Sequence, residues 1–329
     1  MSFDSRYFAI ADNELGMIKQ RNSRILAARE AEIAEKHPEI AAIERELSGT
    51  TGKLISLIAD GAPDIEKRLS ELENENLFLQ EKLKTSLIKA GFPSDYLDTV
   101  YSCKLCKDSG IYEGKRCECF MEMVKKAAAE ELNRSSPMRL TGFDEFSLNY
   151  YDNTAPTVLG CTAREAMEEN YSFCKSYAEN FHLPCGSLLL HGRTGLGKTH
   201  LSLSIASVVL GKGYSVIYGS APDLFRRIEK EQFGNKENAG ATIEALQNAD
   251  LLILDDIGAE FESKFYVSAF YNILNNRMNA SLPTIVSTNL ELTEIQERYG
   301  DRITSRLMTM ENLIFVGKDV RIIKNRGIN

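Results

Sequence analysis

One stretch of the sequence has the residue types and the spacing that bind nucleotide phosphates. Residues 192–199, GRTGLGKT, fit the pattern G-x-x-x-x-G-K-[ST]. In such a loop the glycines let backbone N–H groups turn toward phosphate oxygens, Lys198 reaches the β- and γ-phosphates, and the Thr199 hydroxyl binds Mg²⁺. The pattern therefore predicts ATP or GTP binding by Gly192, Arg193, Thr194, Gly195, Leu196, Gly197, Lys198, Thr199 and His200.

Polar side chains follow two apolar runs downstream of this loop. Asp255 and Asp256 come directly after the branched run 251–254, which reads as a strand buried on both faces. The acids then emerge at the carboxyl edge of the sheet, where Asp255 would hold Mg²⁺ and Asp256 would orient or deprotonate the attacking water. Asn289 follows the next such run, and its amide could hold that water or a γ-phosphate oxygen.

Two arginines further on have helical spacing. Arg302 and Arg306 are four residues apart, so on a helix both guanidinium groups leave the same face. Such a pair could form surface ion pairs with Asp301 or Glu297, or it could supply an arginine finger to the γ-phosphate of a neighbouring subunit. Spacing alone does not choose between these roles.

Four of the seven cysteines form two close pairs ten residues apart. Two thiolates from each pair complete a tetrahedral Zn²⁺ site, and four cysteine ligands leave no open position for catalysis. The segment between the pairs, 107–116, reads as a short hairpin around residues 111–112. We predict structural zinc rather than four free thiols, on Cys103, Cys106, Cys117 and Cys119. Cys161, Cys174 and Cys185 are scattered and are expected in the core.

The elements that must position these residues form a parallel α/β fold. Apolar runs at 188–191, 214–218, 251–254, 284–287 and 313–316 alternate with helical segments, the first of them at 198–210. The boundaries that follow are a helical region at 1–100, a four-cysteine zinc module with a linker helix (120–132) at 101–135, and an ATPase domain at 136–329.

Upstream of the cysteines, residues 12–90 have helical periodicity with interruptions at 37–38, 49–52 and 61–63. The last segment carries an apolar stripe in 3,4 spacing, with Asn76 in its seam, as in a coiled coil. The region is either an arm that pairs with a partner protein or another copy of itself, or an amphipathic hairpin folded on its own domain.

The composition bears on whether this protein contacts membranes or nucleic acids. The chain has 329 residues, of which 43% are apolar, and no apolar run approaches the roughly 20 residues that a membrane helix needs. The N-terminus has no signal pattern, so we expect a cytoplasmic protein without membrane contact. A net charge of −8 argues against coating nucleic acid by bulk electrostatics and leaves room for a local basic groove.

In their order along the chain, the phosphate loop and four later segments resemble a known family. These segments are 254–260, 287–289, 300–306 and 317–321. Together they are similar to the AAA+ ATPases of the bacterial DnaC/DnaI helicase-loader and IstB transposition-helper group, and the cysteine cluster behind a helical region is similar to the DnaI branch. The resemblance implies Asp255 and Asp256 as Walker B acids, Asn289 as sensor 1, Arg306 as the arginine finger and Arg321 as sensor 2. Because only a few residues follow Arg321, we expect no separate lid domain, and the resemblance implies the same, since members of this group lack one.

The implied function is ATP-dependent loading of a hexameric replicative helicase, with subunits that associate through ATP and bind single-stranded DNA. Many AAA+ proteins have Glu where this chain has Asp256, so slow ATP hydrolysis is expected. Residues 218–227 carry aromatic and basic groups that could contact DNA, although a residue such as Phe225 is more often part of a core and Arg226 and Arg227 are more typical of a solvated face. Lys230, Lys236 and the stretch 234–240 read as a mobile loop. The other functions considered are a transposition helper, a nucleotide-switched adaptor and a small-molecule kinase.

Overall fold

A computed structural model describes residues 5–60, 65–135, 140–234 and 240–326 of the chain. It divides into two compact units, one of Met1–Ala11 with Phe120–Asn329 and one of Asp12–Cys119. Each unit is described by itself below. None of the helices in these described ranges combines the length and the apolar character needed to cross a lipid bilayer.

The larger unit is built on a parallel sheet, as the alternating apolar runs predict. In the described part of the chain the sheet has five strands in the order β4-β5-β6-β3-β7. Strands β4 and β7 lie about two residues from their predicted positions, which were 214–218 and 313–316. The strands are β3 (Leu188–His191), β4 (Val216–Ser220), β5 (Leu251–Ile257), β6 (Thr284–Thr288) and β7 (Glu311–Ile314).

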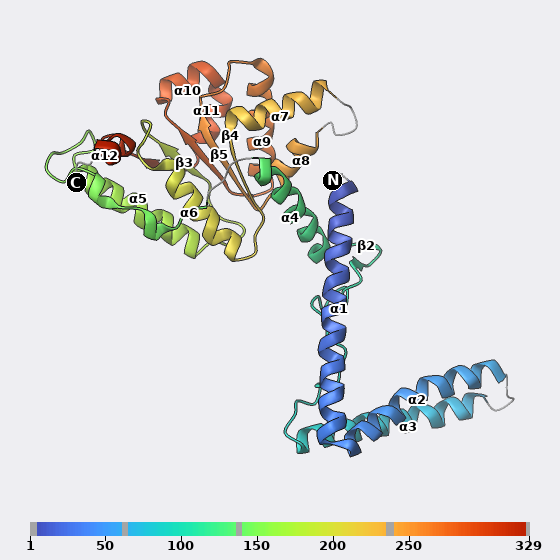
Figure 1. Ribbon diagram of the computed structural model, residues 1–329. Helices are drawn as coiled ribbons and strands as arrows, with labels where there is room; N and C mark the ends of the chain where they lie inside the picture. Colours follow the sequence, from blue (N-terminus) through green and yellow to red (C-terminus); the bar gives the residue numbers. More distant parts are fainter. Residues whose placement is uncertain (1–4, 61–64, 136–139, 235–239, 327–329) are drawn as a thin grey trace. The chain divides into compact units, whose positions relative to one another are not determined.

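Helices cover both faces of this sheet because its central strands are apolar on both sides. Figure 1 shows α5 and α6 on one side and α7, α8 and α9 on the other. Short helices α10 and α11 follow β6, and α12 follows β7. The bounds are α5 (Ala163–Glu179), α6 (Lys198–Gly211), α7 (Ala221–Phe233), α8 (Ala241–Asn248), α9 (Lys264–Asn279), α10 (Leu292–Tyr299), α11 (Asp301–Leu307) and α12 (Val320–Arg326), with 3₁₀ turns η1 (Phe143–Glu145) and η2 (Leu148–Tyr150).

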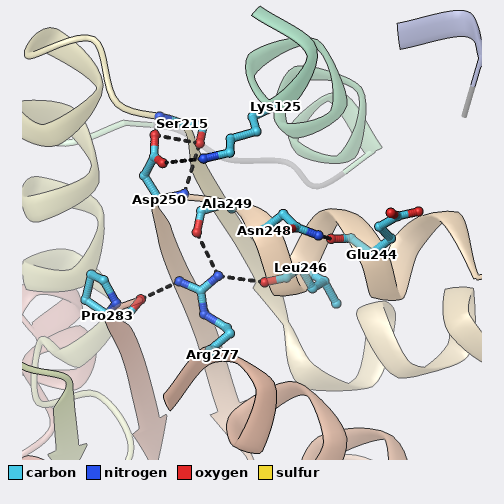
Figure 2. A network of polar contacts seen from close by, with 9 residues as sticks. All are labelled: Lys125, Ser215, Glu244, Leu246, Asn248, Ala249, Asp250, Arg277 and Pro283. Carbon is cyan, nitrogen blue, oxygen red and sulfur yellow. Dashed lines mark hydrogen bonds and ion pairs between the residues drawn. The ribbon is translucent and has the colours of Figure 1, made fainter. Parts of the chain in front are cut away.

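The outer edge of the sheet at β4 is covered by helix α4 (Glu118–Ser135). Asn133 of α4 donates its amide to the carbonyl of Val216 (2.7 Å) and accepts a hydrogen bond from the backbone N–H of Tyr218 (3.0 Å). Lys125, earlier on α4, reaches Asp250 at 3.4 Å (Figure 2). An uncovered edge strand exposes backbone groups to other chains, and α4 satisfies part of this edge internally.

A fully buried arginine joins the elements behind the sheet. Arg277 of α9 is 0% exposed, and its guanidinium donates to the carbonyls of Leu246, Ala249 and Pro283 at 2.6–2.8 Å (Figure 2). It also donates to the hydroxyl of Thr284 at 2.9 Å. Burial lowers the pKa of Arg277, and these four acceptors compensate part of the desolvation. No sequence pattern marked this residue, because an arginine on a helix is ordinarily a surface residue.

The smaller unit contains the predicted helical region. Its helices are α1 (Ser5–Lys36), which begins in the larger unit, α2 (Pro38–Asp60) and α3 (Ile65–Lys89). The break at 37–38 is confirmed, whereas the break expected at 49–52 is wrong, because α2 runs through both glycines. Packing of α2 on α3 outweighs the low helix propensity of glycine at about 1 kcal/mol per residue. The predicted break at 61–63 lies outside the described residues.

The apolar stripe of α3 faces α2, so these two helices form a hairpin. Leu79 is buried, and Asn76 in the seam donates to the hydroxyl of Thr50 at 2.7 Å. The stripe is therefore at least partly used within the chain, as the hairpin alternative expects. Binding of a partner by this region stays a prediction.

Candidate nucleotide site and cysteine cluster

The phosphate loop joins the end of β3 to the start of α6. Gly195 and Gly197 have positive φ values of 74° and 94°, which side chains on L-residues rarely adopt. A Cβ atom on Gly195 would lie 2.1 Å from the Asp319 carboxylate, and one on Gly197 would lie 2.8 Å from the Phe146 ring. The glycines are therefore required both by the backbone conformation and by the close approach of two other segments.

Lys198 lies at the centre of this loop and is only 5% exposed. Its ammonium group donates to the backbone carbonyls of Gly192 and Arg193, the latter at 2.8 Å. Burial lowers the pKa of Lys198, and the carboxylates of Asp256 and Asp255 only partly offset this effect. A buried ammonium held by neutral carbonyls favours an anionic ligand, so the loop fits nucleotide phosphates.

The carboxylate of Asp255 is the meeting point of three hydroxyl groups. Thr199 and Tyr218 each donate to its Oδ2 at 2.8 Å, and Ser287 donates to its Oδ1. Asp255 itself is 3% exposed. A carboxylate beside a threonine hydroxyl supplies the hard oxygen ligands that Mg²⁺ prefers, so Thr199 and Asp255 would hold that ion.

Asp256 lies at an irregularity of β5. The pairing of β5 with β6 shifts register between Leu254 and Ile257, and Asp256 has a φ of 56°. This bulge turns the side chain of Asp256 out of the sheet and into the pocket beside the phosphate loop. Partial burial and then the Asp255 carboxylate raise the pKa of Asp256, while Lys198 and Arg321 oppose the shift.

A pocket of about 210 Å³ lies at this end of the sheet. Arg321 and Lys324 of α12 line it opposite the phosphate loop. Its lining comprises Thr194, Gly195, Leu196, Gly197, Lys198, Thr199, His200, Asp256, Val320, Arg321 and Lys324. The structure thus brings together most of the predicted nucleotide ligands. Asn289 is exposed directly after β6 and does not line this pocket in the described residues.

Arg306 also lies outside this pocket. Its guanidinium donates to Asn275 Oδ1 (2.7 Å) and the Tyr271 hydroxyl (3.1 Å), and its Cζ lies 4.5 Å from the centre of the Tyr271 ring. Arg302 is exposed one turn earlier and lines a separate groove of about 850 Å³. That groove is larger than the nucleotide pocket but has none of the predicted phosphate ligands. Neither arginine forms an ion pair with Asp301 or Glu297 in the described part of the chain, and a role of Arg306 toward another subunit stays a prediction.

The residues considered for DNA contact are mostly engaged within the protein. The Tyr218 hydroxyl points to Asp255, and Phe225 is fully buried. Arg226 pairs with Asp223, and Arg227 pairs with Glu131 and Glu231. Phe225 is therefore a core residue, and the ion pairs of Arg226 and Arg227 are those of a solvated helix face. Lys230 is exposed on α7, and Lys236 lies outside the described residues.

In the smaller unit the two cysteine pairs converge. The four Sγ atoms lie within 4.8 Å of one another, with Cys103 and Cys117 at 3.9 Å and Cys106 and Cys119 at 3.5 Å. Tetrahedral zinc with Zn–S bonds of about 2.3 Å requires S···S separations of roughly 3.8 Å, so the four thiols fit that ion. The predicted hairpin is present as β1 (Ile111–Tyr112) and β2 (Lys115–Arg116). Of the three other cysteines, Cys174 is buried, whereas Cys161 and Cys185 are partly exposed.

Asp108 holds the first cysteine pair in place, and no pattern in the sequence marks this role. It is 3% exposed and accepts hydrogen bonds from the backbone N–H groups of Ser102 (3.0 Å) and Cys103 (2.7 Å). It also accepts one from the side chain of Asn22 on α1 (2.8 Å). An Asp two residues after a Cys-x-x-Cys pair is a turn-forming residue whose role toward α1 has no local signal.

The larger unit thus has a phosphate loop after one parallel strand and paired carboxylates after another, with a buried lysine between them. These features define an ATP-hydrolysing P-loop ATPase.

Comparison with known proteins shows which ATPases this chain is similar to. Residues 180–324 match the family described as IstB-like ATP binding protein. The replicative helicase loader DnaC of Escherichia coli K12 is 27% identical over 194 residues, 59% of this chain and 78% of the relative. DnaC of Buchnera aphidicola subsp. Baizongia pistaciae is 29% identical over 134 residues, 40% of this chain and 54% of the relative. A crystal structure of DnaI shares 23% identity at a TM-score of 0.42, covering 54% of this chain and 92% of that one.

Residues 180–324 of the chain are therefore similar to the IstB-like ATP binding proteins, and the similarity to DnaC extends over 59% of the chain. This confirms the resemblance read from the motifs. The narrower likeness to the DnaI branch, which depends on the cysteine cluster, stays a prediction.

Proposed function

We propose that this protein is an ATP-dependent loader of a replicative DNA helicase. The observation that carries the proposal is its similarity to E. coli DnaC across 78% of that protein, combined with a phosphate loop and a magnesium-binding arrangement that retain their ligands. The intact contacts of Lys198, Thr199 and Asp255 disfavour an adaptor whose nucleotide site is only structural.

ATP acts in this proposal at the interface between subunits. The pocket presents Lys198, Asp256 and Arg321 from one subunit, and Arg306 lies on another surface of the same chain. Self-association that delivers Arg306 to a neighbour's γ-phosphate would complete the site. Asp256 is the general base of the reaction, Asn289 orients the water, and the short arm of Asp256 makes hydrolysis slow, so that bound ATP times the assembly.

The region before the ATPase domain binds the helicase in this proposal. Residues 1–100 form the partner-binding helical region, and residues 101–135 form a zinc module and linker helix that hold it in shape. The cysteine cluster supports this assignment over a transposition helper, since the helpers of this family lack such a module. The assembled subunits bind single-stranded DNA, and the whole activity takes place in the cytoplasm.

The test uses the full chain and the purified hexameric replicative helicase of the same organism. We expect the two proteins to co-elute in size-exclusion chromatography with ATP and Mg²⁺. The Lys198→Ala variant should still bind the helicase but should no longer promote its transfer to a single-stranded DNA bubble. Absence of helicase binding, or binding of a transposase from the same organism instead, would refute the loader function.

A further inference from the structure

Three hydroxyl groups donate hydrogen bonds to the Asp255 carboxylate. A carboxylate offers about four acceptor positions, two on each oxygen. Thr199 and Tyr218 occupy Oδ2, and Ser287 occupies one position on Oδ1. One acceptor position on Oδ1 then remains for the metal or for one of its water ligands. The carboxylate has little freedom to rotate as long as all three hydroxyls bind it.

Tyr218 is the member of this set that the motif does not include. It lies on β4, two residues before Ser220, which is the register partner of Asp255. Its ring packs against the core between the sheet and α6. Its hydroxyl donates to Asp255 Oδ2 at 2.8 Å. A rigid, aromatic donor from the neighbouring strand therefore fixes one side of Oδ2.

The strand that carries Tyr218 is in turn held by α4. Asn133 bonds to β4 on either side of Ile217, through the Val216 carbonyl and the Tyr218 N–H. These two bonds take the place of a neighbouring strand at the sheet edge, directly beside the Tyr218 backbone. A second contact of α4, from Lys125 to Asp250, lies at the other end of β5 and does not involve Tyr218.

We propose that Tyr218 is a positioning residue that aims the Asp255 carboxylate at magnesium, and that Asn133 of α4 sets the place of Tyr218. The inference rests on the proposed role of Asp255 as a magnesium ligand. It links α4, the helix that begins between the last two cysteines of the cluster, to the affinity of the nucleotide site for its metal.

The test measures magnesium affinity rather than turnover. A fluorescent N-methylanthraniloyl derivative of ATP is bound to the full chain, and the free Mg²⁺ concentration is varied. Tyr218→Phe keeps the ring and removes only the donor, so it should raise the half-saturating Mg²⁺ concentration by about 10- to 100-fold. Nucleotide binding in EDTA should stay as in the unaltered protein. Asn133→Ala should raise the same concentration by about 2- to 30-fold.

Two matched variants separate positioning from general damage. Tyr177→Phe also removes a tyrosine hydroxyl bond, to the Gly186 carbonyl, on a residue outside the site. Lys125→Ala loosens α4 without touching β4. Both should leave the magnesium response unchanged.

Asp255→Asn distinguishes failure of the inference from failure of the site assignment. If Asp255→Asn weakens the magnesium response and Tyr218→Phe does not, the positioning role of Tyr218 is wrong. If Asn133→Ala behaves like Lys125→Ala, the contribution of α4 is wrong. If Asp255→Asn itself has no effect, the magnesium role of Asp255 and the inference built on it both fail.

Discussion

Mixing two inactive variants tests whether Arg306 acts on the nucleotide of a neighbouring subunit. Arg306→Ala removes the guanidinium and leaves the nucleotide pocket intact, because Arg306 is not among its lining residues in the described chain. Lys198→Ala disables the nucleotide pocket of its own subunit and leaves the Arg306 side chain of that subunit unchanged. Each variant alone should hydrolyse ATP at a small fraction of the normal rate, since an arginine finger contributes about 10³- to 10⁵-fold to kcat.

The expected rate of the mixture follows from counting interfaces. A working interface needs Lys198 from one subunit and Arg306 from the next. In a random, equal mixture about one quarter of head-to-tail interfaces combine the two intact residues. The mixture should therefore recover about one quarter of the normal rate, whereas a role for Arg306 within its own subunit predicts no recovery.

The structure also indicates how much Arg306→Ala should disturb folding. It removes hydrogen bonds to Asn275, to the Tyr271 hydroxyl and to the Arg302 carbonyl, together with a cation–π contact at 4.5 Å, at a partly buried site. This loss should cost roughly 1–2 kcal/mol of unfolding free energy, which leaves the domain folded.

The assay is steady-state phosphate release at several mixing ratios, with thermal unfolding of each variant as a check. Arg302→Ala is the matched control, because Arg302 is exposed one turn earlier on the same helix. It should retain activity alone. Uniformly inactive mixtures of Arg306→Ala and Lys198→Ala that still assemble would refute the reasoning.

Three other predictions concern single residues. Protein purified without chelator should contain about one zinc per chain, and Cys103→Ser should lose it; a metal-free unaltered protein by mass spectrometry would contradict the site. Asp256→Asn tolerates the same positive φ and should lower kcat by about 10²- to 10⁴-fold with ATP affinity retained; normal turnover would exclude Asp256 as the base. Arg277→Met removes the guanidinium donor from the carbonyls of Leu246 and Ala249 and one of two donors from that of Pro283, and should cost about 3–5 kcal/mol in urea unfolding; a loss below about 1 kcal/mol would show that the site rehydrates.

The sequence predicted those parts of the site whose residues lie close together along the chain. The phosphate loop and the acids of β5 are contiguous motifs whose spacing reflects the geometry of a loop or of one strand end. The cysteine pairs are equally local, and their four sulfurs converge as two knuckles should. The parallel strands followed from runs of branched residues, with errors of about two residues at β4 and β7.

The contacts that the sequence did not predict join residues far apart in the chain. Tyr218 was only one member of a segment considered for DNA contact, and nothing in its local sequence pointed to Asp255. The pairing of β4 with β5 turns its hydroxyl to that carboxylate. Asn133 and Arg277 carry no local signal, since an amide or a guanidinium on a helix is ordinarily solvated. The helix break predicted at the glycines of 49–52 is wrong, because the packing of α3 on α2 keeps α2 helical through them.

By itself, therefore, the sequence determined that this protein has a nucleotide loop, paired acids and a four-cysteine cluster on a parallel α/β fold with a helical extension. Tertiary structure alone decided which side chains surround Asp255, where Arg306 lies and how α4 closes the sheet edge. The physical reason is that a motif records the constraints of one turn or one strand, whereas burial and hydrogen-bond partners depend on which segments the fold brings together.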